Sequence, residues 1–385
     1  MTTYTPKDMI AKLVAFDTTS SKSNLDLIEF VRTYFESYGA TCDVVPNEDG
    51  SKANLYATLG PMEPGGIVLS GHTDVVPVEG QTWHTDPFQV TEKDGRLYGR
   101  GTTDMKSFSA IALALVPNFV ARGLKTPLHF ALSYDEEVGC LGVHSMVDHM
   151  IQKRPRPKCI IVGEPTSMKV VNAHKGLHAF KTTIVGKEAH SSAPHLGGNA
   201  IVAAGSLIHY LSSVAEAFTR ETRRGARFDP PYATINVGTI TGGSAVNIIP
   251  KSCSFLWEFR SLPDQDPQVI IDGFESFAQQ DVLPKLQQNA PDASIVTELT
   301  AVIPTFTPLK GSPAETLTLI LAQQNDSYAV SYGTEAGIFQ NADIPTVVCG
   351  PGDIAQAHQP NEFISLEQVD ACEAFLRRLM DHVCN

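Results

Sequence analysis

The sequence predicts an α/β protein whose main domain, layered α/β/α, is interrupted by an inserted ferredoxin-like α+β domain. Three observations support this prediction. Short apolar strands alternate with amphipathic helices near both ends of the chain. Between them the expected elements run β-α-β-β-α-β, the order of a ferredoxin-like unit. The 385 residues also exceed what one hydrophobic core usually holds. We therefore expect the main domain at residues 1–178 and 301–385, and the insert at residues 179–300.

The first part of the chain begins with helices and continues with strands. Apolar residues recur at helical spacing over residues 5–16 and 24–38. Thr5 and Pro6 are typical of a helix start, and Gly39 is typical of a helix end. Apolar runs predict strands at residues 41–46, 53–59, 67–70, 128–134 and 159–162.

The insert and the returning segment show the same kinds of pattern. Within the insert we expect strands at 180–185, 234–240, 252–260 and 293–298, with helices at 199–213 and 269–280. After the insert we expect a helix at 313–324, a strand at 345–349 and a closing helix at 366–381. The main domain is therefore expected to be discontinuous in sequence.

Composition narrows the possible partners. A formal net charge of −13 disfavours nucleic acid and anionic membranes. The seven cysteines are odd in number, scattered and never in C-x-x-C spacing, which indicates reduced thiols. Apolar stretches are interrupted before membrane-spanning length, and no signal region precedes the first helix. These features predict a cytoplasmic protein without a nucleic-acid or membrane partner.

Polar side chains at the ends of the expected strands form the candidate site. His72 and Asp74 follow the strand at 67–70, which Gly71 ends. A carboxylate two residues beyond a histidine can accept its second ring N–H and so orient the ring for a metal ion. A histidine and an aspartate in an ordinary solvated loop are the alternative at this point.

Later strand ends repeat the pattern. Asp104 follows two glycines and precedes an apolar helix, so a helix N-cap is the alternative reading. Residues 135–137 (DEE) place three carboxylates at the end of a strand, where they repel one another unless a cation or proton intervenes. Glu164 ends the next strand after Gly163, and His358 lies in a late loop.

Two imidazoles and several carboxylates suit a borderline-soft divalent ion, for which Zn²⁺ is expected and Co²⁺ or Mn²⁺ are substitutes. There are more donors than one tetrahedral ion needs, and the number fits two. The candidates are His72, Asp104, Glu136, Glu137, Glu164 and His358. In two-metal hydrolases a carboxylate bridges the ions, which polarise a carbonyl and lower the pKa of a bridging water, while another carboxylate moves the proton. Glu136 and Glu137 would divide these roles.

Five motifs, in order along nearly the whole chain, resemble a di-zinc amidohydrolase and metallopeptidase family. That family includes acetylornithine deacetylase, succinyl-diaminopimelate desuccinylase, aminoacylases and carboxypeptidases. The motifs are residues 71–77 (GHTDVVP), 99–106 (GRGTTDMK), 135–137 (DEE) and 163–165 (GEP), and His358.

The resemblance implies a role for each of these side chains. His72 and Glu164 would hold one zinc ion. Glu137 and His358 would hold the other, and Asp104 would bridge the two. Asp74 would stand behind His72, and Glu136 would be the general acid and base.

Segments of the insert resemble the family's lid and dimerisation domain. Residues 186–195 (GKEAHSSAPH) imply that His190 reaches the active site of the partner in a homodimer and stabilises the oxyanion. Residues 242–250 (GGSAVNIIP) and Arg260 imply that Asn247 and Arg260 bind the substrate carboxylate, which a guanidinium can hold with two hydrogen bonds. From the residues alone, an exposed loop histidine and a surface arginine are the alternatives.

Within the family, four segments look most like acetylornithine deacetylases. They are residues 15–21 (AFDTTSS), 174–176 (HKG), 333–337 (GTEAG) and 350–352 (GPG). This implies hydrolysis of a small N-acyl amino acid, N2-acetyl-L-ornithine, to L-ornithine and acetate in arginine biosynthesis, by a metal-bridged water that Glu136 activates.

Two questions stay open at this point. Glu335 is a candidate partner for the side-chain ammonium of the substrate, and a helix-terminal carboxylate facing water is the alternative. Desuccinylase, aminoacylase or dipeptidase activity on the same metal centre is the nearest rival function. A non-catalytic binding module is disfavoured because Glu136 and every expected ligand are present.

Overall fold

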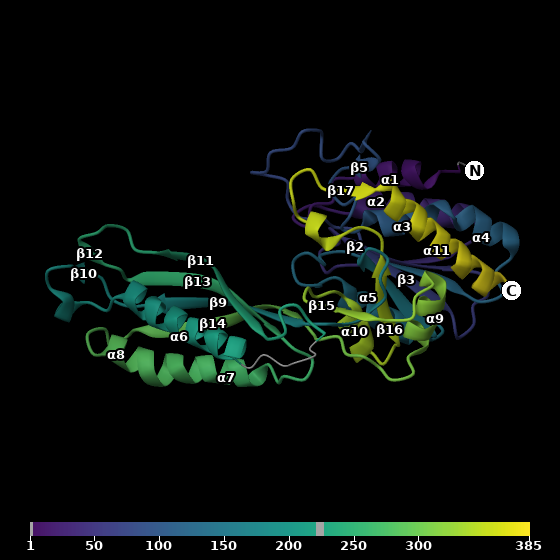
Figure 1. Cartoon of the computed structure of the whole chain (residues 1–385). Helices are drawn as coiled ribbons and strands as arrows, with labels where there is room; N and C mark the ends of the chain where they lie inside the picture. The colour runs from purple at the N-terminus through teal and green to yellow at the C-terminus, as the bar shows by residue number, and fades with distance from the viewer. Residues whose placement is uncertain (1–2, 221–226) are drawn as a thin grey trace. The chain divides into compact units, whose positions relative to one another are not determined.

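The computed structural model describes residues 3–220 and 227–385, and the chain forms two compact units (Figure 1). The first unit comprises Met1–Ala173, Phe306–Ala329 and Thr334–Asn385. The second comprises His174–Thr305 and Val330–Gly333. The chain thus enters the second unit five residues before the expected boundary at 179 and leaves it five residues after the expected boundary at 300. The short stretch Val330–Gly333 also belongs to the second unit, which no sequence pattern indicated.

The first unit is built on an eight-stranded mixed sheet with the order β1-β2-β6-β3-β7-β16-β8-β15. The strands are β1 (Thr41–Pro46), β2 (Ala53–Leu59), β3 (Ile67–His72), β6 (Leu128–Ser133), β7 (Cys159–Pro165), β8 (Val171–His174), β15 (Tyr328–Val330) and β16 (Thr346–Gly350). β3 pairs in parallel with β6 and β7, and β16 pairs in parallel with β7. These four strands therefore end at the same edge of the sheet, where open α/β sheets place their sites.

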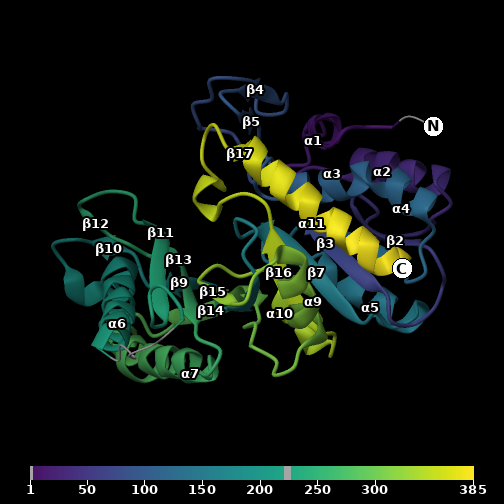
Figure 2. The same cartoon turned by 45° about the vertical axis from the view of Figure 1, so that its right-hand side comes forward.

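Helices cover this sheet. They are α1 (Pro6–Val14), α2 (Leu25–Ser37), α3 (Lys106–Ala114), α4 (Val116–Arg122), α5 (Val143–Lys153), α9 (Pro313–Ala322), α10 (Ala336–Asn341) and α11 (Leu366–Cys384). Thr5 caps α1 as expected, because its side chain accepts the Asp8 N–H and the Asp8 carboxylate accepts the Thr5 N–H. Figures 1 and 2 show α11 running beside α3. Apolar residues from both helices join those of β2, β3 and β6 in one core.

A small three-stranded sheet also belongs to the first unit. It contains β4 (Thr91–Lys93), β5 (Arg96–Tyr98) and β17 (Phe363–Ser365), in the order β17-β5-β4. A short helix, η3 (Ile354–Gln356), precedes β17. Because these strands have only three residues each, the sequence pattern did not predict them. Their pairing joins the segment before Asp104 to the segment after His358.

The second unit confirms the predicted ferredoxin-like arrangement. Its antiparallel sheet has the order β11-β13-β9-β14, with β9 (Gly176–Val185), β11 (Thr234–Gly242), β13 (Ser252–Ser261) and β14 (Ser294–Ile303). The helical segments are α6 (Ala200–Arg220), α7 (Gln268–Phe277), η2 (Ala278–Val282) and α8 (Leu283–Gln287), with η1 (Pro194–Leu196) before them. Alternate residues of β13 are buried, and Phe255 and Trp257 pack with Leu207 of α6 and Phe274 of α7. A two-stranded ribbon, β10 (Ala189–His190) with β12 (Ile248–Ile249), completes the unit.

Helix α6 is the one helix of the described residues that is long and apolar enough to cross a membrane, by length and composition alone. The sequence predicted a helix at residues 199–213 and no apolar stretch of membrane-spanning length. Its residues Ala200, Ala204, Leu207 and Leu211 are buried in the core of the second unit. Packing of this kind is what a helix needs when it covers one face of a sheet.

Candidate metal centre

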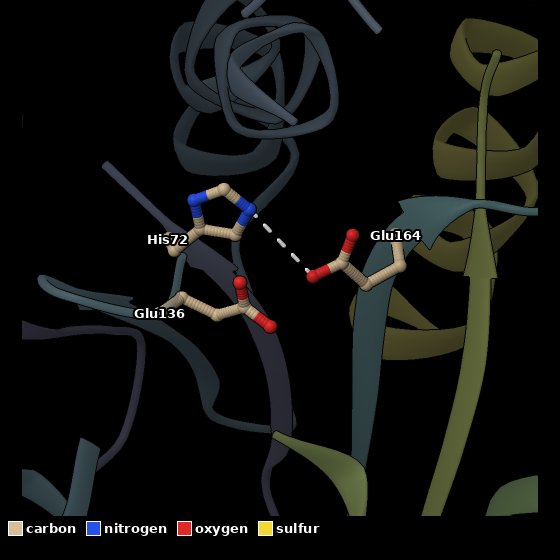
Figure 3. Close-up of side chains that lie close together, drawn as sticks. All are labelled: His72, Glu136 and Glu164. Atoms are coloured by element: carbon tan, nitrogen blue, oxygen red, sulfur yellow. Dashed lines mark ion pairs between the residues drawn. The ribbon is translucent and has the colours of Figure 1, made fainter. Parts of the chain in front are cut away.

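The parallel strands bring three acidic or imidazole side chains to one edge of the sheet. His72 is the last residue of β3, Glu164 lies near the end of β7, and Glu136 follows β6 by three residues. Figure 3 shows the carboxylates of Glu136 and Glu164 on the same side of the His72 ring. His72 Nε2 lies 3.7 Å from Glu164 Oε1. This convergence follows from the register, in which His72 stands opposite Ser133 at the end of β6.

Asp104 lies between two imidazoles. Its Oδ1 is 3.0 Å from Nε2 of His72, and its Oδ2 is 3.2 Å from Nε2 of His358. The alternative reading of Asp104 as a helix N-cap is wrong, because Met105 occupies the N-cap position of α3 and no side chain caps that helix. The two oxygens of one carboxylate are therefore directed at ring nitrogens from opposite ends of the chain.

His358 brings the late loop to the same place. Its Nε2 lies 2.9 Å from Oε2 of Glu137, and 53% of its side chain is exposed, whereas 5% of the Glu137 side chain is. The pairs His72 with Glu164 and His358 with Glu137 are those that the family resemblance implied for the two ions. Asp104 contacts both histidines, as a bridging ligand must.

Asp74 has more partners than the sequence suggested. His72 Nδ1 lies 2.9 Å from the main-chain oxygen of Asp74 and 3.5 Å from its carboxylate. The carboxylate accepts hydrogen bonds from Ser20 Oγ at 2.8 Å and from the N–H groups of Glu136 and Glu137 at 3.1 and 3.2 Å. Asp74 therefore holds the loop that carries both glutamates. Sequence reasoning missed Ser20, although it lies in the segment 15–21 that carried part of the resemblance.

The third carboxylate of the acidic run has a different partner. Asp135 is 2.5 Å from Nζ of Lys52, and both side chains are largely buried. This ion pair neutralises Asp135 and leaves Glu136 and Glu137 as the members of the run that face the histidines.

Burial and neighbouring carboxylates raise the pKa values of the glutamates of the site. Burial, with Asp104 and other carboxylates nearby, raises the pKa of Glu164 well above its usual value. Burial and the neighbouring Glu137 raise the pKa of Glu136 in the same way. The pKa of Glu137 rises to about 7 for the same two reasons, with Asp104 as the main neighbour.

The pKa values of the two histidines and of Asp104 shift in the directions that favour the charged forms of these residues. Hydrogen bonds to Asp104 and Glu137 raise the pKa of His358 to about 10. Burial opposes charge on His72, but bonds to Asp104 and Asp74 raise its pKa well above the usual value. Burial also acts to raise the pKa of Asp104, yet both imidazoles bring it below the usual value. In the part of the chain that the structure describes, no lysine or arginine forms an ion pair with this cluster.

The donor set fits divalent metal ions. Donor atoms of His72, Glu136 and Glu164 lie within 4.8 Å of one another, as do those of His72, Asp104 and Glu137. Imidazole nitrogens and carboxylate oxygens are the ligands expected for Zn²⁺ and similar ions. Divalent metal ions bound in this cluster would supply positive charge and so favour the ionised form of the carboxylates.

Glu335 is buried. Only 1% of the residue is exposed, and Ser133 Oγ donates to its Oε1 at 2.5 Å. The alternative reading of Glu335 as a carboxylate facing water is therefore wrong. Its role as the partner of the substrate ammonium stays a prediction. Burial raises its pKa to about 7.

Three candidate residues lie in the second unit, at two separate places. His190 and Asn247 are exposed and lie together, because His190 pairs with Ile248 and the Ser191 N–H donates to the Asn247 oxygen at 3.0 Å. Figure 1 shows the β10–β12 ribbon beyond one end of the four-stranded sheet.

Arg260 lies at the other end of that sheet. It pairs with Leu177 near the start of β9, and its Nη1 donates to the Ser331 oxygen at 3.5 Å. The ten residues of β9 separate it from the ribbon, a distance of about 30 Å at roughly 3.3 Å per residue. Asn247 and Arg260 therefore do not meet within one chain, and their predicted joint contact with one substrate carboxylate would need residues of two chains.

Comparison of the sequence with models of known protein families identifies the family of this chain. A family model described as peptidase family M20/M25/M40 matches residues 68–382. The chain belongs to this family. The match spans both units and every candidate metal ligand, and the predicted family resemblance is thereby confirmed.

Relatives within the M20 family cover almost the whole chain. It is 36% identical over 384 residues to an acetylornithine deacetylase of Pasteurella multocida (strain Pm70), covering 98% of this chain and 97% of that one. It is also 36% identical over 386 residues to an acetylornithine deacetylase of Myxococcus xanthus, covering 97% and 96%.

Solved structures confirm the fold class. The M20 metallo-carboxypeptidase Sso-CP2 of Sulfolobus solfataricus matches with a TM-score of 0.77 at 16% identity, over 98% of this chain and 99% of that one. The aminopeptidase PepT of Bacillus cereus matches with a TM-score of 0.73 at 19% identity, over 99% and 98%. At these identities the likeness concerns the fold alone.

Proposed function

We propose that this chain is an acetylornithine deacetylase, a metal-dependent hydrolase that converts N2-acetyl-L-ornithine to L-ornithine and acetate. Two relatives of that name, each 36% identical over nearly full length, support the choice of substrate. The observation that carries the reaction type is the placement of Asp104 between His72 and His358, with Glu136 close by and outside every ion pair among the described residues.

Five side chains would hold two divalent ions, with Zn²⁺ proposed and Co²⁺ as a substitute. His72 and Glu164 belong to the first ion, Glu137 and His358 to the second, and Asp104 to both. When bound, the ions act as Lewis acids that polarise the acetyl carbonyl and lower the pKa of the attacking water.

Glu136 is the proton carrier. Its carboxylate takes a proton from the attacking water and gives it to the leaving amine, as a general base and then a general acid. Asp74 fixes the main chain of Glu136 by accepting its N–H at 3.1 Å. Cys140 Sγ lies 3.5 Å from Glu136 Oε1.

The active form is a homodimer in the cytoplasm. His190 and Arg260 lie at opposite ends of one sheet, so a small substrate cannot touch both in one chain. Arg260 binds the substrate carboxylate in its own chain, whereas His190 and Asn247 act at the site of the partner. In that role His190 stabilises the negative oxygen that develops during hydrolysis.

A screen of released amine tests the function. N2-acetyl-L-ornithine, N-succinyl-diaminopimelate, other N-acetyl amino acids and dipeptides are offered with Zn²⁺ or Co²⁺. We expect the highest kcat/KM for acetylornithine. A higher value for the succinyl substrate or for a dipeptide would instead assign the chain to a sister activity within the family.

A further inference from the structure

Glu362 is a buried carboxylate that no sequence pattern singled out. It follows His358 by four residues and has no exposed surface. Its Oε1 accepts the N–H groups of Thr103 and Asp104 at 2.7 and 3.1 Å. Its Oε2 accepts the Gly101 N–H at 3.1 Å and Nη1 of Arg100 at 2.7 Å. Both oxygens are therefore engaged by the loop that ends in Asp104, 258 residues earlier in the sequence.

Arg100 connects Glu362 to the loop that contains His358. Only 1% of Arg100 is exposed, and its Nη2 donates to Oε1 of Gln81 at 2.6 Å. Nε2 of Gln81 in turn donates to the main-chain oxygen of His358 at 2.8 Å. The chain of polar contacts thus runs from Asp104 through Glu362, Arg100 and Gln81 to His358.

Main-chain pairing holds the same two segments in register. Tyr98 pairs with Phe363 between β5 and β17, and the Gly99 N–H donates to the Glu362 oxygen at 2.9 Å. Thr103 Oγ1 also donates to the Phe363 oxygen at 2.6 Å. The small sheet therefore places Glu362 beside the loop, and the carboxylate then orients the N–H groups of that loop.

We propose that Glu362, together with Arg100 and Gln81, is a positioning residue that sets the placement of Asp104 relative to His358 and so the affinity of the second metal ion. This inference rests on the proposed function, in which both side chains are ligands of that ion. The backbone of His358 has φ +63°, a conformation that residues other than glycine seldom adopt. Such a conformation persists when its surroundings hold it, and the bond from Gln81 to the carbonyl of His358 is one such constraint.

The Glu362→Gln substitution removes the negative charge of this side chain while keeping nearly the same shape. Glutamine has nearly the same shape, but its NH₂ group is a donor and would face donors at one of the two oxygen positions. The loop must then shift away or leave a buried donor unpaired, which is costly. Loss of groups that orient metal ligands typically weakens metal affinity 10–100-fold. We expect a smaller effect on the first ion, because His72 and Glu164 stand at the ends of buried strands.

The test measures metal binding directly. The full-length protein is stripped of metal and titrated with Co²⁺ or Zn²⁺ by calorimetry, for the parent and for Glu362→Gln, Gln81→Ala and Glu92→Gln. Glu92 is the matched control because it lies on β4 of the same small sheet but pairs with the exposed Lys7. We expect the second binding step to weaken about 10–100-fold in Glu362→Gln and less in Gln81→Ala. It should be unchanged in Glu92→Gln.

A second readout separates positioning from general loss of structure. The metal concentration that gives half-maximal activity should rise in Glu362→Gln, while KM for acetylornithine stays near that of the parent. Thermal unfolding of the metal-free proteins reports whether each variant folds. If Glu362→Gln does not fold, Gln81→Ala decides, because Gln81 lies partly exposed on a loop.

Each outcome has a separate meaning. Folded variants that bind the second ion as tightly as the parent would overturn the inference. A parent that binds only one ion would overturn both this inference and the two-ion site. A parent that binds two ions but does not hydrolyse acetylornithine would overturn the proposed function, and the comparison of second-ion affinities would still test Glu362.

Discussion

Adjacent glutamates in this site have different surroundings, and this difference should be measurable. Glu137 contacts His358 at 2.9 Å, whereas Glu136 makes no ion pair among the described residues and lies beside the Cys140 thiol. The proposed metal ligand and the proposed proton carrier are thus adjacent in the sequence. The Asp74 carboxylate accepts the main-chain N–H groups of both residues.

Exchange of each glutamate for glutamine should separate these roles. Glu136→Gln should keep both metal ions yet lower kcat by roughly 10²–10⁴, since it removes the general base. Glu137→Gln should instead release the second ion. Metal content by mass spectrometry, measured beside kcat, checks both expectations. Equal loss of metal from the two variants would show that the assignment of roles is wrong.

Glu335 gives a pH-dependent effect on stability. Burial raises its pKa from the usual 4.5 to about 7 in the folded protein. Between these values the folded state holds a proton that the unfolded state releases, so stability falls as pH rises through this window. Glutamine resembles the protonated form. In metal-free protein, Glu335→Gln should therefore match the parent near pH 4 and exceed its unfolding free energy by about 3 kcal/mol at pH 8.

Denaturant unfolding across pH 4–8 measures this difference. The exposed Glu92→Gln is the control and should show no such pH-dependent gain. A Glu335→Gln variant that is less stable than the parent at pH 8 would mean that the buried carboxylate is ionised and paired in the folded protein.

At the scale of elements, close packing at the strand ends fixes the positions of the proposed ligands. Gly163 precedes Glu164 on β7, and a Cβ at this position would come within 2.0 Å of the Phe108 ring of α3. The contact lets α3, which follows Asp104, lie directly against β7. The Phe108 ring thus packs directly on the main chain of β7, beside Glu164.

Two glycine substitutions should have opposite effects. Gly163→Ala should destabilise the first unit by about 1–3 kcal/mol, because an added methyl group forces Phe108 and α3 to move. Gly205→Ala is the matched change within α6, where a Cβ meets nothing within 4 Å, and it should stabilise by about 0.5–1 kcal/mol. Calorimetric unfolding measures both. Similar small effects from the two substitutions would contradict the packing argument.

At the scale of the whole molecule, the proposed roles of His190 and Arg260 require a site that two chains complete, because the two residues lie at opposite ends of one sheet. Mixing inactive Glu136→Gln protein with inactive His190→Ala protein should restore part of the activity. In the mixed dimer one site combines an intact Glu136 with an intact His190. The assay is acetylornithine hydrolysis before and after mixing. No recovery, once subunit exchange is demonstrated by mass-tagged chains, would mean that His190 does not act across the interface.

The sequence by itself determined the element pattern and the placement of the main ligands. Apolar runs that end in glycine and a polar residue predicted that His72 and Glu164 lie at strand ends. The β-α-β-β-α-β order predicted the second unit. These features are local, because the twofold period of a strand and the helical period are properties of neighbouring residues. They can therefore be recognised in the amino-acid sequence alone.

Only the tertiary structure decided which partners each polar group has. Asp104 could have been a helix cap, Glu335 could have been exposed, and Asn247 could have met Arg260. Glu362 carried no signal, since its donors lie 258 residues away. Hydrogen bonds, burial and pKa shifts depend on atoms brought together by packing, and the order of residues in the chain does not specify those distances.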